Sequence, residues 1–234
     1  MHKLSIIIPA YNEEKTIQQL LAKVDAVDLS KYKTTKEIII VDDGSKDKTR
    51  EKIQELKKPY ILIQQEKNQG KGAAIRKGIG HATGDIILIQ DADLEYDPND
   101  YGKLIEPIIT NKAKVVYGSR RLQKANVQYS GLSFYLGGHM MTFLTNLLYN
   151  AAITDEPTCY KVFAADFLKS IPLQCKRFEF CPEITAKVLR RGIPIYEVPI
   201  SYHPRSVKEG KKIRWKDGLE GIWTLIKYKF VDEP

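Results

Sequence analysis

Short apolar runs alternate with longer amphipathic segments through the first half of the chain. A strand of a parallel sheet is covered on both faces, so its sequence is continuously apolar rather than alternating. We therefore predict strands at Leu4–Ile8, Glu37–Val41, Tyr60–Gln64, Ile86–Ile89 and Lys114–Tyr117. The amphipathic segments predict helices at Glu13–Val24 (N-cap Asn12), Thr49–Leu56, Lys71–Ala82 and Pro98–Ile109. This order predicts an α/β fold with a mostly parallel central sheet and helices on both faces.

Polar and glycine residues follow the carboxyl end of each predicted strand. Ligands of such sheets bind in the crevice beyond the carboxyl ends of the strands. We therefore expect one shared crevice, lined by Pro9–Glu13, Asp42–Ser45, Asn68–Gly72, Gln90–Asp93 and Gly118–Arg121.

Two carboxylates, Asp91 and Asp93, directly follow the apolar run Ile86–Ile89. Carboxylates one residue apart on an extended backbone point to the same side. Hard oxygen ligands of this kind suit Mg²⁺ or Mn²⁺, which keeps open positions for substrate phosphates. The pair favours a metal and diphosphate site, although a strand-end turn with solvated aspartates has the same sequence.

A long stretch of the second half is uncharged, with no Lys, Arg, Asp or Glu between Ala125 and Thr154. Large apolar residues recur there at helical spacing, which predicts a helix. Gly137, Gly138 and His139 argue against a helix that spans a membrane. Two alternatives stay open: a helix of the protein core, and a helix that lies in a membrane interface.

Further elements are predicted towards the end of the chain. A helix begins near Pro182 and ends at Arg191, with Gly192 closing it, and a strand covers Ile195–Tyr202. A basic loop, His203–Lys216, precedes an amphipathic helix. The apolar stripe of that helix contains Trp215, Leu219, Ile222, Trp223, Ile226 and Phe230.

The composition is that of an ordinary globular protein, with 43% hydrophobic and 28% charged residues. A net charge of +8 favours an anionic partner, such as nucleotide phosphates or an anionic membrane surface. The basic residues lack the interleaved aromatic side chains of single-strand binders, so we expect no nucleic-acid partner. Cys159, Cys175 and Cys181 follow no metal or redox spacing, which predicts buried thiols and a cytosolic location.

The segments at the predicted strand ends resemble those of one enzyme family. In chain order they read IIIPAYNEE, IIIVDDGSKDKT, NQGKGAAIRKG, ATGDIILIQDADLE and VVYGSRR, over residues 3 to 121. Together they resemble the family-2 glycosyltransferases. DADLE, GSR and EVPISYHPRSVKEGKK are most similar to the polyprenyl-phosphate glycosyltransferases, the dolichyl-phosphate mannose synthase-like subgroup.

The resemblance implies a Rossmann-like nucleotide-diphospho-sugar transferase fold (GT-A). It implies an inverting, metal-dependent transfer of a hexose from a donor of the GDP-mannose or UDP-glucose type to a polyprenyl or dolichyl phosphate. UDP-N-acetylglucosamine stays open as a donor, and so does the oligomeric state. We assign residues 1–203 to the catalytic domain, and residues 204–234 to a basic loop and helix that pack on it or extend it.

The resemblance also assigns the nucleoside end of the donor site. Pro9, Tyr11 and Glu13 match the family segment that holds the nucleoside. Val41 and Asp42 match the strand end that contacts the base or the ribose. These residues are therefore expected at one end of the crevice.

The acidic segment matches the family's metal site. Asp91 and Asp93 match the metal-binding pair, and Ala92 between them lines the nucleotide pocket. Glu95 stands where dolichyl-type synthases often have Gln, and a glutamate there can serve as a third ligand of Mg²⁺ or Mn²⁺. Arg120 matches the arginine that meets a phosphate.

Three basic residues are candidates for binding the diphosphate. Arg205 and Lys211 match the mobile basic loop that closes over the diphosphate in the family. Lys71 lies between two glycines at a predicted helix start, where it either faces a phosphate or is solvated.

The acceptor decides whether the reaction needs a general base. A lipid phosphate is already an anion and needs none, and Arg120 and Arg121 are candidates to hold it. A saccharide hydroxyl needs a base. Asp155 is then the candidate, unless it is a turn carboxylate. Asp93, Arg120 and Asp155 form the predicted catalytic set.

An uncharged helix and a basic C-terminal face predict peripheral attachment to the cytoplasmic face of a membrane. Two other functions stay open. One is a family-2 enzyme that acts on a saccharide hydroxyl in polysaccharide or cell-envelope synthesis. The other is a receiver-type phosphoacceptor domain, because Asp42 and Asp43 also form an acidic pair at a strand end.

Overall fold

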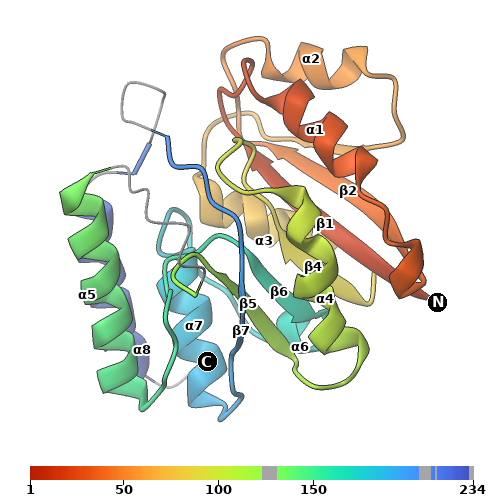
Figure 1. Ribbon diagram of the computed structural model, residues 1–234. Coiled ribbons are helices and arrows are strands. Elements are labelled where there is room, and N and C mark those ends of the chain that lie inside the picture. Colours follow the sequence, from red (N-terminus) through yellow and green to blue (C-terminus); the bar gives the residue numbers. More distant parts are fainter. Residues whose placement is uncertain (123–130, 206–211, 214, 232–234) are drawn as a thin grey trace.

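The computed structural model describes residues 1–122, 131–205, 212–213 and 215–231. Within these residues a seven-stranded sheet forms the centre of the molecule (Figure 1). Its strands are β1 His2–Ala10, β2 Thr34–Asp42, β3 Ile61–Gln64, β4 Ile86–Ile89, β5 Val115–Ser119, β6 Lys161–Ala164 and β7 Tyr196–Pro199. Their order is β3-β2-β1-β4-β6-β5-β7, and β6 alone runs antiparallel to its neighbours. The predicted α/β fold with a mostly parallel sheet is confirmed.

Helices connect most of the strands and cover both faces of the sheet (Figure 1). The α-helices are α1 Ile17–Ala26, α2 Thr49–Glu55, α3 Lys71–His81, α4 Tyr101–Ile109, α5 Leu132–Tyr149, α6 Ala165–Lys169, α7 Phe180–Arg190 and α8 Trp215–Phe230. Two 3-10 turns, η1 Ser30–Tyr32 and η2 Pro98–Asp100, precede β2 and α4.

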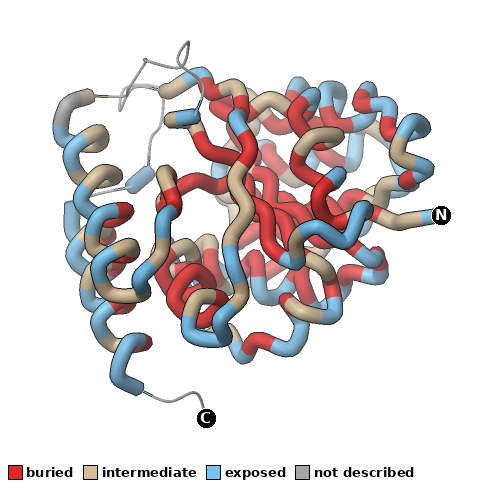
Figure 2. The backbone as a smooth tube through the Cα atoms, turned by 60° about the horizontal axis from the view of Figure 1, so that its bottom comes forward, coloured by how far each residue is buried: buried red, intermediate tan, exposed pale blue. Residues whose placement is uncertain are grey.

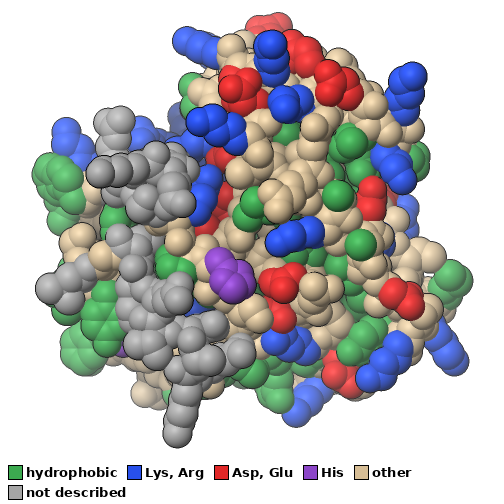
Figure 3. Space-filling model, turned by 45° about the horizontal axis from the view of Figure 1, so that its top comes forward, with side chains coloured by type: hydrophobic (Ala, Val, Ile, Leu, Met, Phe, Trp, Pro, Cys, Tyr) green, Lys and Arg blue, Asp and Glu red, His purple; other side chains and the backbone are tan. Residues whose placement is uncertain are grey.

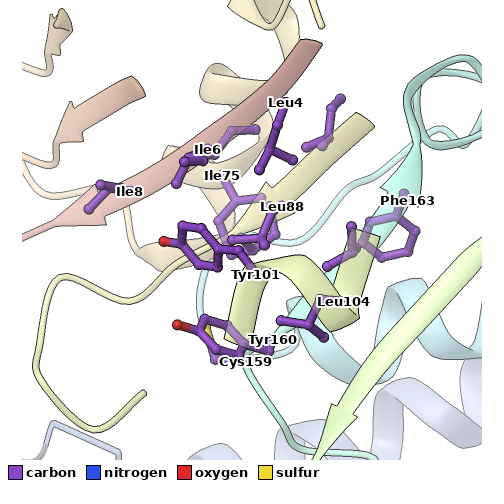
Figure 4. Close-up of a cluster of buried hydrophobic side chains, with 14 of the residues drawn as sticks. Leu4, Ile6, Ile8, Ile75, Leu88, Tyr101, Leu104, Cys159, Tyr160 and Phe163 are labelled. Atoms are coloured by element: carbon purple, nitrogen blue, oxygen red, sulfur yellow. The ribbon is translucent and has the colours of Figure 1, made fainter. Parts of the chain in front are cut away.

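Alternating side chains of β1 fill the two sides of the core. Ile6 and its neighbours at two-residue spacing lie with Tyr101 and Leu104 of α4 in one buried cluster (Figure 4). Ile7 points the other way, because successive side chains of a strand face opposite sides. It meets α3 at Gly78, where an added Cβ would lie 2.5 Å from Ile7 Cγ2. The core is therefore continuous through the sheet, as the concentration of buried residues in Figure 2 shows.

Some elements differ from the sequence-based prediction. Strand β6 was not predicted, because its first residue is a lysine. Lys161 is nevertheless fully buried, and its ammonium donates to the carbonyl of Glu156 (2.6 Å). The predicted N-cap Asn12 is wrong: it has a left-handed φ of 51°, and its side chain accepts from the amide of Lys46. Helix α1 consequently begins only at Ile17.

Helices α5 and α8 lie side by side at one edge of the molecule (Figure 1). Met141 of α5 packs with Leu225 and Tyr228 of α8 and with Ala186 of α7 in a second, smaller core cluster. The opposite faces of both helices are covered by no described residue. Large apolar side chains there are 37% to 76% exposed: Leu136, Met140, Phe143, Leu147, Trp215, Leu219, Trp223, Ile226 and Phe230. We call this set the apolar face.

The apolar face bears on the two interpretations of the uncharged segment. A helix of the protein core would bury the stripe Leu136, Met140, Phe143 and Leu147, whereas the structure exposes all four. The core interpretation therefore fits the side of α5 that carries Met141 but not this stripe, and contact of the stripe with a membrane stays a prediction. Among the described residues, none of the helices is long and apolar enough to cross a membrane. Cys159 and Cys175 are buried thiols, as expected, and Cys181 is half-buried.

Candidate active site

A cleft of about 1000 Å³ opens at the carboxyl ends of β1, β2 and β4. All five predicted strand-end segments contribute to its lining, with residues that include Pro9, Asp43, Gln69, Asp91 and Arg120. The expected shared crevice is therefore present. Figure 3 shows acidic and basic side chains next to one another on this side of the molecule.

One end of the cleft is lined by Pro9, Tyr11 and Glu13, the residues expected to hold the nucleoside. Val41 and Asp42 are not part of this lining. Both are completely buried, and Asp42 accepts from the guanidinium of Arg50 (2.7 Å). The expectation that Val41 and Asp42 reach the base or the ribose does not fit this geometry.

Asp43 is the carboxylate that the second strand presents to the cleft. Its Oδ1 accepts from the amide of Gln69 (2.7 Å) and its Oδ2 from the amide of Gly70 (2.8 Å). Burial raises the pKa of Asp43. The sequence carried a signal for this residue, because adjacent side chains at a strand end point to opposite sides and only one of two aspartates can face the cleft.

Lys71 forms an ion pair with Asp91, at 2.5 Å between Nζ and Oδ1. Burial alone would raise the pKa of Asp91, but the Lys71 charge outweighs it and the pKa is lowered. The first free amides of α3 do not face an anion: Gly72 N and Ala73 N donate to the carbonyls of Arg177 and Lys176, both at 2.9 Å. Lys71 is therefore a paired lysine in the cleft wall rather than a solvated one.

Arg205 lies among the remaining acidic residues of the cleft. Its guanidinium is 2.6 Å from Asp93 and 3.5 Å from both Glu13 and Glu95. Burial, together with the charges of Asp91 and Glu95, raises the pKa of Asp93 to about 7. Arg205 thus partly neutralises a carboxylate whose charge the surroundings disfavour.

Glu95 holds the chain segment that carries Arg205. Its carboxylate accepts from the hydroxyl of Tyr202 (2.7 Å) and from the amide of Arg205 (3.1 Å). Lys212 extends the same basic segment and pairs with Glu13 at 2.7 Å. Lys211, the other predicted phosphate ligand of the loop, lies outside the described residues.

The donor chemistry of the acidic pair fits a hard divalent cation. Asp91 and Asp93 line the cleft and offer carboxylate oxygens, which Mg²⁺ and Mn²⁺ prefer. In the part of the chain that the structure describes, no three Asp, Glu, His or Cys side chains form a group that could hold a metal ion. The predicted third ligand, Glu95, instead holds Tyr202 and Arg205. A metal here would therefore need oxygens from a bound diphosphate as well.

Arg120 and Asp155 form a two-bond ion pair beside the cleft. Nε and Nη2 of Arg120 donate to the two carboxylate oxygens at 2.7 Å each, and the Arg120 amide adds a third bond at 3.0 Å. Asp155 is completely buried. Burial acts to raise its pKa, but Arg120 lowers it. These contacts make Asp155 a positioning residue for Arg120; they do not fit a general base.

Arg121 binds α5 and the segment that follows it, and it does not line the cleft. Its Nη1 donates to the hydroxyl of Thr142 (3.1 Å) and to the carbonyl of Thr154 (2.7 Å). The cleft lining contains Arg120 but not Arg121. Of the two arginines suggested for the acceptor phosphate, Arg120 is the one in reach of a ligand in the cleft.

The cleft at the strand ends of this mostly parallel α/β sheet is lined by both carboxylates and basic side chains. Nucleotides bind at this place in many α/β enzymes. The family model of "Glycosyl transferase family 2" matches residues 5–171. The chain therefore belongs to glycosyl transferase family 2, and it is a glycosyltransferase. This assignment replaces the receiver-type alternative.

The relatives of the chain include dolichyl-phosphate enzymes that differ in their sugar. A dolichyl-phosphate beta-glucosyltransferase of Trichomonas vaginalis is 32% identical, over 97% of this chain and 77% of the relative. A UDP-N-acetylglucosamine–dolichyl-phosphate N-acetylglucosaminyltransferase of Methanococcus voltae is 33% identical, over 89% of each chain. The dolichol-phosphate mannosyltransferase of Pyrococcus furiosus is 32% identical, over 97% of this chain and 64% of the relative.

The fold is similar to that of a solved glycosyltransferase structure. Glucosyl-3-phosphoglycerate synthase of Mycobacterium tuberculosis, crystallised with Mn²⁺, UDP and phosphoglyceric acid, superposes with a TM-score of 0.72. The alignment covers 99% of this chain and 80% of the synthase, at 18% identity. The likeness extends beyond the family match to almost the whole chain, and the GT-A fold is thereby confirmed.

Proposed function

We propose that this glycosyltransferase moves a hexose from a nucleotide-diphospho-sugar to a polyprenyl phosphate of the dolichyl type, with inversion and with Mg²⁺ or Mn²⁺. The observation that carries the proposal is the composition of the cleft. One part of its lining is acidic and basic, around Asp91 and Asp93, and another part comes from α5, α7 and α8. The outer sides of α5 and α8 carry the apolar face. Such a cleft suits a charged donor and a lipid acceptor together.

Donor binding is assigned to the residues around the acidic pair. Asp91 and Asp93 would hold the metal, which stabilises charge on the leaving diphosphate. Lys71 and Arg205 are cations at the same place and can donate to phosphate oxygens once a ligand competes for their carboxylates. Asp43 and Tyr11 line the part of the cleft assigned to the nucleoside.

Acceptor activation needs positive charge rather than a base. Asp155 fixes two nitrogens of Arg120, and the third, Nη1, makes no hydrogen bond to a described residue. The guanidinium also lies over the ring of Tyr202, at 5.0 Å. Arg120 can therefore hold the anionic phosphate of the acceptor in a fixed orientation. A single attack by that phosphate on the face opposite the leaving group inverts the anomeric centre.

The site of action follows from the acceptor and from the apolar face. Each buried CH₂ adds about 0.8 kcal/mol to membrane binding, so a long isoprenoid stays in the bilayer and the enzyme must come to it. The apolar face would lie in the interface, with exposed Lys216 and Lys229 of α8 near anionic headgroups. We propose peripheral attachment on the cytoplasmic face.

A donor and acceptor panel tests the proposal. Purified protein with Mn²⁺ is given UDP-glucose, GDP-mannose or UDP-N-acetylglucosamine, with and without polyprenyl phosphate, and the released nucleoside diphosphate is measured. We expect release from one donor, strongly increased by polyprenyl phosphate and lost in Arg120→Gln. Arg191→Gln, at an exposed arginine outside the cleft lining, is the matched control. Release stimulated by a saccharide instead of the lipid would favour the hydroxyl-acceptor alternative.

A further inference from the structure

Glu156 is a buried acid of the cleft wall to which the proposed reaction gives no role. The residue is 0% exposed and belongs to the cleft lining. Its Oε1 accepts from the hydroxyl of Thr185 (3.1 Å). Its Oε2 has no hydrogen-bond partner among the described residues. An unpaired buried oxygen destabilises a fold, so its presence calls for an explanation.

The backbone around Glu156 is fixed on both sides. Its amide donates to the hydroxyl of Thr142 (3.1 Å), and its carbonyl accepts from the buried ammonium of Lys161 (2.6 Å). The preceding residue, Asp155, is bound by Arg120. These bonds fix the backbone at Glu156, and Thr185 holds one carboxylate oxygen, so Oε2 is the atom left for a ligand.

The strand order tells which part of a donor comes near Glu156. Asp43 follows β2, and Asp91 follows β4 at the middle of the sheet. The segment of Glu156 leads into β6, on the other side of β4 from β2. A nucleotide-sugar is a chain of base, ribose, diphosphate and sugar. With the base near Asp43 and the diphosphate at Asp91, the sugar reaches the side of Glu156.

We propose that Glu156 recognises the donor sugar by accepting a hydrogen bond from one of its hydroxyls at Oε2. A carboxylate there suits a hydroxyl group and repels a phosphate, so the acceptor phosphate binds elsewhere, at Arg120. The same cleft lining contains Pro157, Met141 and Pro182, apolar groups against which the C–H face of a pyranose can pack. Glu156 thereby becomes a residue that binds the sugar of the donor and not its nucleotide. This inference rests on the proposed function.

Binding of a nucleotide with and without its sugar tests the inference. Dissociation constants of UDP and UDP-glucose, and of GDP and GDP-mannose, are measured by calorimetry with Mn²⁺ for the wild type, Glu156→Gln and Glu156→Ala. We expect both variants to bind the nucleoside diphosphate within about twofold of the wild type. The matching nucleotide-sugar should bind Glu156→Ala about tenfold more weakly, as loss of one such hydrogen bond predicts.

Two controls separate this role from a structural one. Glu197 accepts from the amides of Thr154 and Asp155 outside the cleft, so Glu197→Gln should loosen the segment and lower the melting temperature. Glu156→Gln should not lower it. Unchanged nucleotide-sugar affinity in Glu156→Ala, or equal losses for nucleotide and nucleotide-sugar, would overturn the inference alone. A wild type that binds neither nucleoside diphosphate nor nucleotide-sugar would overturn the proposed function as well.

Discussion

The acidic residues of the cleft differ in how fully a basic side chain neutralises them. Asp91 is matched by Lys71, and its pKa is lowered. Asp93 shares Arg205 with Glu13 and Glu95, and its pKa is raised to about 7 by burial and by neighbouring carboxylates. The charge on Asp93 is therefore unfavourable in the folded protein without a bound cation. Strongly shifted groups of this kind are typical of functional sites.

The raised pKa of Asp93 makes stability depend on pH. Its folded value, about 7, lies above the ordinary 3.8, so its stabilising contribution is complete below pH 4 and is lost as the pH rises through 7. In EDTA, Asp93→Asn should match the wild type near pH 4 and exceed it at pH 8 by about 4 kcal/mol, because the pKa rises from 3.8 to about 7. Urea unfolding at both values measures this. A variant less stable than the wild type at pH 8 would contradict the assignment.

At the scale of elements, helix α3 is placed by a close approach to the sheet. A Cβ on Gly78 would lie 2.5 Å from Ile7 Cγ2 and 3.4 Å from Val41 Cγ2, whereas a Cβ on Gly80 would meet nothing within 4 Å. Since α3 begins at Lys71, this contact also sets the position of the lysine that pairs with Asp91.

Gly78 and Gly80 of α3 give a matched pair of substitutions. Gly78→Ala should lower the free energy of unfolding by about 1–3 kcal/mol, because the added methyl overpacks the core. Gly80→Ala should raise it by about 0.5–1 kcal/mol, because alanine favours the helix and meets open space. Denaturant unfolding of both variants measures the difference. Equal effects of the two substitutions would contradict the packing described for α3.

Arg205, near the start of the basic loop, lies against the acidic residues of the cleft. Tyr202 and Arg205 are both bound to Glu95, and the Arg205 side chain reaches Asp93. A divalent cation at Asp93 must displace this guanidinium. Arg205→Gln should therefore bind Mn²⁺ about tenfold more tightly in the absence of nucleotide, whereas Arg191→Gln, outside the cleft lining, should not. Titration followed by the EPR signal of free Mn²⁺ measures both; unchanged affinity would contradict the competition.

The sequence predicted the parallel strands well, because the strands buried on both faces read as continuous apolar runs. It could not predict β6, where the ammonium of Lys161 is satisfied by a carbonyl that only the fold brings near. It identified the acidic pair but not the cation facing each carboxylate, since Lys71 and Arg205 come from distant segments. Asp155 seemed a candidate base only because its partner Arg120, 35 residues earlier, was unknown.

At the scale of the whole molecule, the cleft and the apolar face share helices. Met141 of α5 and Gly221 of α8 line the cleft, while the other sides of the same two helices are exposed and apolar. Hydrophobic side chains gather at the edge of the molecule beside α5 and α8 (Figure 3). A contiguous apolar surface of this kind marks an interaction site. The proposed bilayer contact thus places a lipid acceptor next to the donor site.

The apolar face should be needed for membrane binding but not for nucleotide binding. Leu219→Glu with Trp223→Glu should reduce co-sedimentation with anionic liposomes at least about tenfold, because two large apolar side chains lose their burial in lipid. Gln19→Glu with Gln54→Glu adds the same charge at exposed positions elsewhere and should leave binding nearly unchanged. Equal liposome binding by both double variants would argue against this face as the contact.

The central claim is transfer of a sugar to a lipid phosphate, and the product itself tests it most directly. Wild-type protein is incubated with Mn²⁺, polyprenyl phosphate and each labelled nucleotide-sugar, and the lipid extract is analysed by mass spectrometry. We predict one polyprenyl-phosphate hexose or N-acetylhexosamine, formed from one donor and absent when polyprenol replaces its phosphate. Label found only on a saccharide or as free sugar, with no glycosylated lipid phosphate from any donor, would contradict the account.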